Sequence, residues 1–347
     1  MNMDNIKTKT DKNVAKAIAR TIAFFDLFSY PLTGFEVWKY LDVKCELAEV
    51  LEVLENIAKK SPLVPLFERG QVERKNGFYF LAGREEIIKE RMARYNYSDK
   101  KFKRAVWLSR IFKFIPWIKM IAVGNIIGAH NLKKESDIDL FIITEKNRVW
   151  LTRLFCVLII KILGLRPKPE NMRDKICLSF FISEEAMDLE KLMLSCKISR
   201  DSTCLAGRRV ASLQNDRMEK DIYFIYWLAG LVPIYNRDNI YNKFIGANNW
   251  LKNYLPNWER GEVNYRRDAG KGFSRFYRDV VDMFFGGLER RTKNLELKMM
   301  PEQLKSIVNK DTRVVADKGV IKLHVNDRRE EYKNKLKAKN EELKAVL

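Results

Sequence analysis

The chain has 347 residues, more than one ordinary domain needs, and its 46% hydrophobic content is enough for packed cores, which excludes wholesale disorder. Its 65 lysines and arginines outnumber its 45 acidic residues by 20, a balance that suits a partner carrying phosphates, such as a nucleic acid, a nucleotide or an anionic surface. A solubilising, lysine-rich surface gives the same net charge, so both interpretations stay open.

The first 83 residues predict three helices followed by a β-hairpin. An apolar helix over 15–28 ends before Pro31, and residues 33–36, Thr-Gly-Phe-Glu, have the pattern of a capping box that starts a second helix. A third helix is predicted over 47–60. Two short strands then flank Asn76-Gly77, a pair that favours a tight hairpin turn.

This order of elements resembles a winged helix-turn-helix, which we assign to residues 14–83. A winged helix suggests DNA binding, and the basic residues Arg69, Arg74 and Lys75 on the hairpin suit phosphate contacts. However, glutamates on the exposed side of the third helix would face the DNA backbone with the wrong sign. They are Glu46, Glu49, Glu52 and Glu55. We therefore expect an accessory domain that contacts protein and does not read DNA sequence.

Three further regions follow: a basic helical connector over 84–118, an α/β core over 119–185 and a helical, basic C-terminal region over 186–347. In the core, the pattern predicts strands over 119–123, 138–144 and 175–182, and a helix over 149–165. The predicted fold class is a multidomain α+β protein, with a winged helix, a small central mixed sheet with helices, and a mostly helical C-terminal part.

The C-terminal segment 260–291 mixes arginines with aromatic residues. Such a mixture can grip RNA through backbone charge and stacking. Amphipathic core helices have the same composition, and we favour that interpretation here.

The apolar stretches 154–165 and 222–235 are shorter than the roughly 20 residues of a membrane-spanning helix. The first residues contain no apolar h-region, so no signal peptide is expected. The five cysteines form no Cys-x-x-Cys pair, and Cys156 and Cys177 lie in apolar runs, where a thiol acts as a small hydrophobic residue. We expect a reduced, cytoplasmic protein without a membrane span or a structural zinc site.

The segment 122–144 carries the most specific chemical signal. Asp137 and Asp139 stand two residues apart at the start of an apolar strand, and the period of a strand puts both carboxylates on one face. Two adjacent carboxylates repel each other unless a cation lies between them, and their oxygen atoms suit Mg²⁺. Upstream, Gly124-Asn125 follows a strand, where a glycine turn lets backbone amides approach a phosphate.

These residues resemble the DNA polymerase β-like nucleotidyltransferase superfamily. Its signature is a strand, a Gly-Ser or Gly-Gly turn, a spacer and Asp-x-Asp in an apolar strand; here Gly124-Asn125, the spacer to Ser136 and the run 137–143 match it. The resemblance implies Asp137 and Asp139 as catalytic residues and ligands of Mg²⁺ or Mn²⁺. It implies nucleotide binding by Gly124, Asn125, Ser136 and Lys133.

Two features depart from the signature. Asn125 replaces the usual serine or glycine, and the strand over 175–182 lacks the third carboxylate of active members. Ser179 occupies an inward position on that strand, whereas Glu184 and Glu185 follow its end. One of these glutamates lying near the aspartates would support catalysis.

The leading hypothesis is a Mg²⁺-dependent nucleotidyltransferase that moves a nucleoside monophosphate from an NTP, taken as ATP, to an acceptor on RNA, protein or a small molecule. The alternatives are an inactive protein of this fold that binds nucleotide or nucleic acid, and a winged-helix regulator. His130 is expected to be an exposed loop residue, and His324 a local packing or hydrogen-bonding residue.

Overall fold

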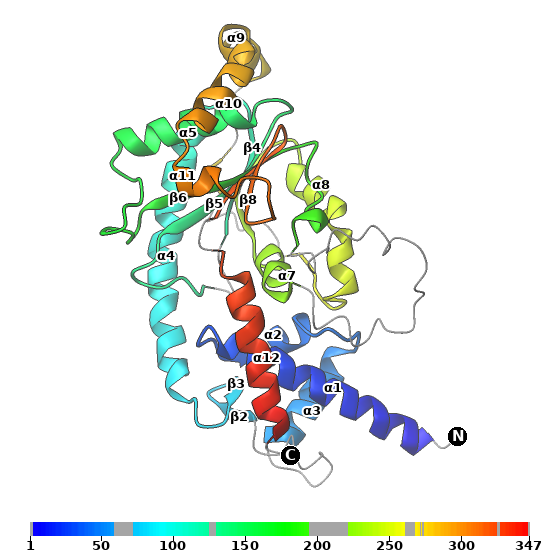
Figure 1. Ribbon diagram of the computed structural model, residues 1–347. Coiled ribbons are helices and arrows are strands. Elements are labelled where there is room, and N and C mark those ends of the chain that lie inside the picture. The colour runs from blue at the N-terminus through cyan, green and yellow to red at the C-terminus, as the bar shows by residue number, and fades with distance from the viewer. Residues whose placement is uncertain are drawn as a thin grey trace.

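The computed structural model in Figure 1 is a mixed α/β structure with one large mixed sheet and a mostly helical C-terminal region. It describes residues 3–58, 72–124, 130–193, 221–260, 268–270, 272, 274–324 and 327–345. None of the helices within these ranges is long and apolar enough to cross a membrane.

The central sheet has six strands in the order β7-β4-β5-β6-β9-β8. Only the β5–β6 pair is parallel, and α5 (Val149–Ile162) connects its two strands. The other strand pairs are antiparallel. The strands are β4 (Ile118–Val123), β5 (Ile138–Thr144), β6 (Ile176–Ser183), β7 (Val232–Asn236), β8 (Val314–Ala316) and β9 (Val320–Leu323).

The three predicted core strands and their helix are confirmed to within two or three residues at their ends. The sheet nevertheless extends past residue 185, the end predicted for the core. Strands β7, β8 and β9 come from the region expected to be mostly helical and cover both edges of the predicted sheet. Each is five residues or shorter, too short for a clear period in the sequence.

The N-terminal unit contains the predicted three helices and hairpin. They are α1 (Met3–Asp26), β1 (Leu32–Thr33), α2 (Gly34–Lys39), α3 (Leu47–Ala58), β2 (Val72–Lys75) and β3 (Phe78–Leu81). Both halves of the capping box form, since the Glu36 amide donates to Thr33 Oγ1 at 3.2 Å and the Thr33 amide donates to Glu36 Oε2 at 2.8 Å. Asn76 and Gly77 take the positive φ angles of the predicted turn.

The connector is a single helix, α4 (Glu86–Phe112), which runs from the N-terminal unit along the sheet (Figure 1). At its first end Arg91 pairs with Glu36 at 2.8 Å. Towards its other end the buried Lys101 donates to the backbone oxygen of Ser136, directly before the aspartate pair. The helix therefore fixes the loop that leads into β5.

Two layers of helices cover the sheet. On one face Phe141 and Phe180 pack with α7 (Ile222–Ala229) and α8 (Ile240–Ala247), and with the N-terminal unit beyond them. On the other face the sheet packs against α4 and α5. The remaining C-terminal helices are α9 (Arg275–Phe285), α10 (Glu289–Lys298), α11 (Glu302–Lys305) and α12 (Arg329–Ala345).

Helix α9 projects from the end of the molecule opposite the N-terminal unit (Figure 1). Its polar side chains hold it in place: Asp282 accepts from Trp117 Nε1 and from Arg148, both at 2.6 Å. Its apolar face is open, with Phe276 and Met283 78% and 73% exposed. The interpretation of 260–291 as core helices is therefore wrong for α9, which has no buried residue.

We expect Phe276→Ser to change the free energy of unfolding by less than about 0.5 kcal/mol, because the ring buries little surface. Asp282→Ala should lower it by about 1–2 kcal/mol, because Arg148 and Trp117 lose their shared acceptor at a partly exposed site. Urea denaturation measures both. A larger loss for Phe276→Ser than for Asp282→Ala would contradict this description of α9.

Candidate functional site

Two aspartates and a cysteine meet at the start of the parallel strand pair. Asp139 on β5 lies in register with Cys177 on β6, and Asp137 directly precedes β5. One ligand atom from each residue lies within 4.8 Å of the other two, and all three residues are half-buried. Carboxylate oxygen and cysteine sulfur both bind metal ions, so this cluster is able to hold one.

A register shift shapes the next part of the site. The pairing moves from Asp139 opposite Cys177 to Phe141 opposite Phe180, so β6 has one residue more than β5 at this point. A bulge of this kind redirects side chains and is common beside functional sites. Here Cys177, Ser179 and Phe180 all contribute to the same cavity.

The cluster carries negative charge that the described residues leave unpaired. Neither Asp137 nor Asp139 forms an ion pair with a lysine or arginine in the ranges that the structure describes. Burial first, and then the charge of Asp139, raise the pKa of Asp137 to about 6. Lys101 opposes this shift from a distance, but its ammonium group pairs with Asp174 at 2.9 Å. Burial and the charge of Asp139 also raise the pKa of the Cys177 thiol well above its usual value.

The cluster forms one wall of a cavity of about 440 Å³, a size typical of small-molecule sites. Helix α7 supplies an aromatic wall, in which Trp227 stacks on Phe180 at 5.3 Å between ring centroids. A third wall comes from β9 and the start of α12. It contains Lys322, His324, Asp327, Arg328 and Arg329.

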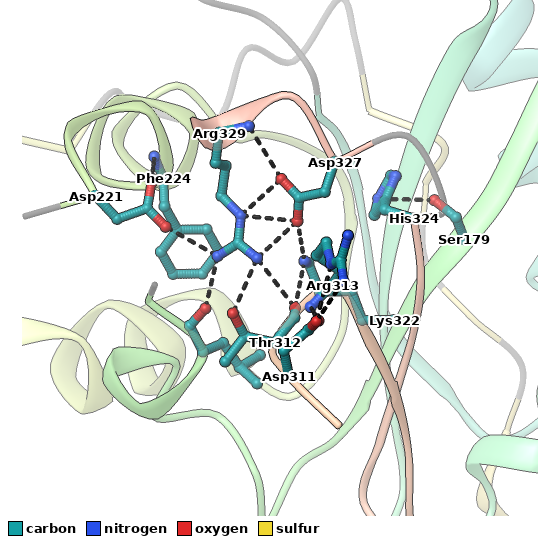
Figure 2. A network of polar contacts seen from close by, with 11 residues as sticks. Ser179, Asp221, Phe224, Asp311, Thr312, Arg313, Lys322, His324, Asp327 and Arg329 are labelled. Carbon is teal, nitrogen blue, oxygen red and sulfur yellow. Dashed lines mark hydrogen bonds and ion pairs between the residues drawn. The ribbon is translucent and has the colours of Figure 1, made fainter. Parts of the chain in front are cut away.

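A buried ion-pair network stabilises this third wall (Figure 2). Arg329, 3% exposed, pairs with Asp221 at 2.8 Å and with Asp327 at 2.6 Å. It also donates to the backbone oxygen atoms of Leu192 and Thr312. Because Asp221 caps α7 by accepting from the Phe224 amide, the same network positions the aromatic wall.

Lys322 belongs to this network as well. Its ammonium group pairs with Asp327 at 2.9 Å and donates to the Thr312 oxygen at 2.6 Å. Burial, and then the charge of Arg329, lower the pKa of Lys322 to about 8. Burial tends to raise the pKa of Asp327, but the hydrogen bonds from Arg329 and the charge of Lys322 hold it below its usual range. Lys322 and Arg329 are thus largely neutralised by Asp327 and Asp221.

His324 lies 3.0 Å from Ser179, measured from Nε2 to Oγ (Figure 2). The expectation of a hydrogen-bonding role for His324 is confirmed, although the residue also lines the cavity. His130 has a different environment: it is half-buried, not exposed as expected, and its ring packs in a tilted arrangement against Tyr95 at 4.5 Å between centroids. It is not among the residues that line the cavity.

The predicted nucleotide-binding residues are only partly brought together. Gly124 lines the cavity, but its amide donates to the backbone carbonyl oxygen of Asp139 at 2.9 Å and is not free to bind a phosphate. Asn125 lies outside the described residues. Ser136 holds the loop by donating to the Lys133 oxygen at 3.0 Å, and the side chain of Lys133 is exposed. Neither residue is among those that line the cavity.

Glu184 and Glu185 do not supply a third carboxylate. They follow the far end of β6, where Ser183 pairs with Thr144, whereas the aspartates lie at the start of the strand pair. Seven residues of strand separate Cys177 from Glu184, which corresponds to about 20 Å. Glu184 pairs instead with Lys119, and Glu185 with Lys146, both at 2.6 Å.

Cys156 is fully buried, as expected of a small hydrophobic residue, whereas Cys177 is half-buried and lines the cavity. The strand period could have indicated that Cys177 faces away from the core, because it alternates with the buried Ile176 and Leu178. The aromatic wall and the Arg329 network had no comparable signal, since they depend on segments that are distant in the chain.

Comparison with protein-family models, with curated proteins and with solved structures finds no match to this chain. The chemistry of the site therefore rests on its own residues.

Replacing Asp221 with alanine should lower the free energy of unfolding by about 3–5 kcal/mol, because it leaves the buried Arg329 partly unpaired and removes the cap of α7. The control is Glu331→Ala, which removes an exposed partner of Arg328 and should cost less than about 1 kcal/mol. Urea denaturation compares the two variants. Equal losses would show that the Arg329 network does not stabilise the fold.

The raised pKa of Asp137 predicts a pH-dependent stability in metal-free protein. The folded chain holds this proton more tightly than the unfolded chain, so ionisation between about pH 4 and pH 6 lowers the free energy of unfolding. The asparagine side chain of Asp137→Asn does not ionise, so this contribution to the free energy of unfolding is absent from the variant. Its stability relative to wild type should therefore rise across this interval and level off above it. Denaturation in the presence of a chelator measures the difference, and a pH-independent difference would contradict the assignment.

Proposed function

We propose that the cavity binds a nucleoside triphosphate through a divalent cation and that the protein is a metal-dependent nucleotidyltransferase. The observation that carries this proposal is the pair Asp137 and Asp139, unpaired within the described residues, at the edge of a cavity with an aromatic wall. Two carboxylates fit a Mg²⁺ or Mn²⁺ ion that also binds substrate phosphates.

In this proposal the chain's own residues bind and orient the nucleotide. Asp137 and Asp139 hold the cation, which would offset the charge that develops during phosphoryl transfer. Trp227 and Tyr223 on α7 line the cavity and offer apolar contacts to a base, although Trp227 already stacks on Phe180 and Phe224. Gly124 keeps this surface close, because a Cβ atom there would lie 3.3 Å from Trp227 Nε1. Arg328 is exposed at the cavity and is available to a phosphate in exchange for its surface pair with Glu331.

A nucleotidyltransferase needs a general base or an equivalent group to activate the acceptor hydroxyl. Among the described residues that line the cavity, Asp327 is the one further carboxylate, and it is bound by both Arg329 and Lys322. This observation favours a second candidate, a protein of the same fold that binds nucleotide without transferring it. The acceptor in the first candidate would be a hydroxyl group on RNA, protein or a small molecule.

We further propose that the N-terminal unit is a winged-helix-like accessory domain. On its hairpin Arg74 pairs with Glu55 and Lys75 with Glu85, so acids of the neighbouring elements partly offset these two charges. Arg69 lies outside the described residues. Local pairing of basic residues with acids favours a supporting role over sequence-specific DNA reading.

Calorimetric titration of ATP and the other NTPs, with and without Mg²⁺ or Mn²⁺, tests the proposal on wild type and on Asp139→Asn. We expect metal-dependent binding that the variant weakens by at least about tenfold, since it loses one metal ligand. Lys133→Ala is the control and should bind like wild type, because its exposed side chain lies off the cavity.

Nucleotide binding that ignores both the metal and Asp139→Asn would contradict the site. No binding of any NTP by folded protein would contradict both candidate functions. Binding without transfer to any acceptor would favour the second candidate.

A further inference from the structure

The ligand set beside the cavity is chemically mixed, with two hard carboxylates and one soft sulfur. We propose that the site selects a thiophilic divalent ion of the Zn²⁺ or Co²⁺ type, bound by Asp137, Asp139 and the thiolate of Cys177. The inference rests on the proposed function only for the location of the metal. It assigns to this location an ion of the Zn²⁺ or Co²⁺ type in place of Mg²⁺.

The backbone supports this set of ligands. Asp139 and Cys177 are register partners on adjacent parallel strands, so their side chains leave the same face of the sheet side by side. Ligand atoms on one tetrahedral ion, with bonds of about 2.0–2.3 Å, are about 3.3–3.8 Å apart. The three atoms already lie within 4.8 Å of one another, so side-chain rotations suffice to close the site.

The charges of the two aspartates favour a bound cation. Asp137 and Asp139 have no ion-pair partner among the described residues, although the protein as a whole carries a net charge of +20. Metal binding converts the thiol of Cys177 to a thiolate and releases its proton to solvent. Three negative ligands then face one dication, which removes most of the repulsion that the empty cluster would hold.

The sulfur decides which ion is preferred. Mg²⁺ binds oxygen and gains little from a thiolate, whereas Zn²⁺ and Co²⁺ bind thiolate, imidazole and carboxylate together. Three protein ligands also leave one position of a tetrahedral ion open, the arrangement found in catalytic zinc sites. Because Asp137, Asp139 and Cys177 all line the cavity, water or a substrate oxygen would have access to an ion that they hold.

The surroundings keep the sulfur in this position. Ser179, 8% exposed, hydrogen-bonds to the Cys177 sulfur and is itself 3.0 Å from His324 Nε2. Hydrogen bonds of this kind orient a ligand and tune its basicity. Cys45, by contrast, is buried in the N-terminal unit beside Asn257, with no carboxylate cluster recorded there among the described residues.

Titration of metal-free, reduced protein with Co²⁺ tests the proposal directly, because a thiolate ligand produces a sulfur-to-cobalt charge-transfer band. We expect the band in wild type and its loss in Cys177→Ser. Competition with Zn²⁺ should show about 100-fold weaker binding by Cys177→Ser, with Mg²⁺ affinity changed less than about twofold. Asp139→Asn should weaken binding of all three ions.

The controls are Cys45→Ser, which removes a buried thiol elsewhere, and the double variant Cys196→Ser/Cys204→Ser, which removes the two thiols outside the described residues. Both should keep the band. A band that persists in Cys177→Ser, or Co²⁺ binding by wild type without any band, would overturn the proposal.

These outcomes are separate from those of the nucleotide titration. A thiolate band without NTP binding contradicts only the proposed function. Mg²⁺-dependent NTP binding without a band contradicts only this inference.

Discussion

The buried guanidinium group of Arg329 links the segments that form the cavity. Arg329 connects four segments that are distant in the chain: the end of the loop after β6, the start of α7, the turn before β8 and the start of α12. Removing such a group from water is costly, and only a full set of partners offsets that cost. Arg329 has this set in Asp221, Asp327, Thr312 and Leu192. The aromatic wall and the basic wall therefore keep a fixed separation.

The two polar walls of the cavity differ in how their charges are balanced. On the basic wall, Lys322 and Arg329 are paired with Asp327 and Asp221, so they attract an anion only weakly. On the acidic wall, the described residues provide no partner for the two aspartates. A phosphate-bearing ligand would therefore be repelled by the site unless a cation is bound first. The electrostatics would make binding of any phosphate-bearing ligand in this cavity conditional on a cation, in a protein whose overall charge is positive.

The sequence predicted what local physics determines. The capping box, the hairpin turn and strands β4, β5 and β6 depend on neighbouring residues and on period, and each was located to within a few residues. It did not predict the short strands β7, β9 and β8, which extend the sheet by pairing with β4, β6 and β9, respectively. The Asp pair was found because both acids lie on one strand. Cys177 and the aromatic wall were missed because their proximity to that pair depends on strand register and helix packing.

Helix α12 contacts both the N-terminal unit and the cavity. Arg329 at its start belongs to the cavity wall, and Lys339 further along pairs with Asp26 of α1. The aromatic side of α1 is also covered, since Phe24 stacks on Tyr226 of α7 at 4.4 Å. Figure 1 shows α12 lying against this unit. Helix α1 is thus packed against the two helices that carry cavity walls. These contacts make the N-terminal unit a support for α7 and α12, and with them for the geometry of the site.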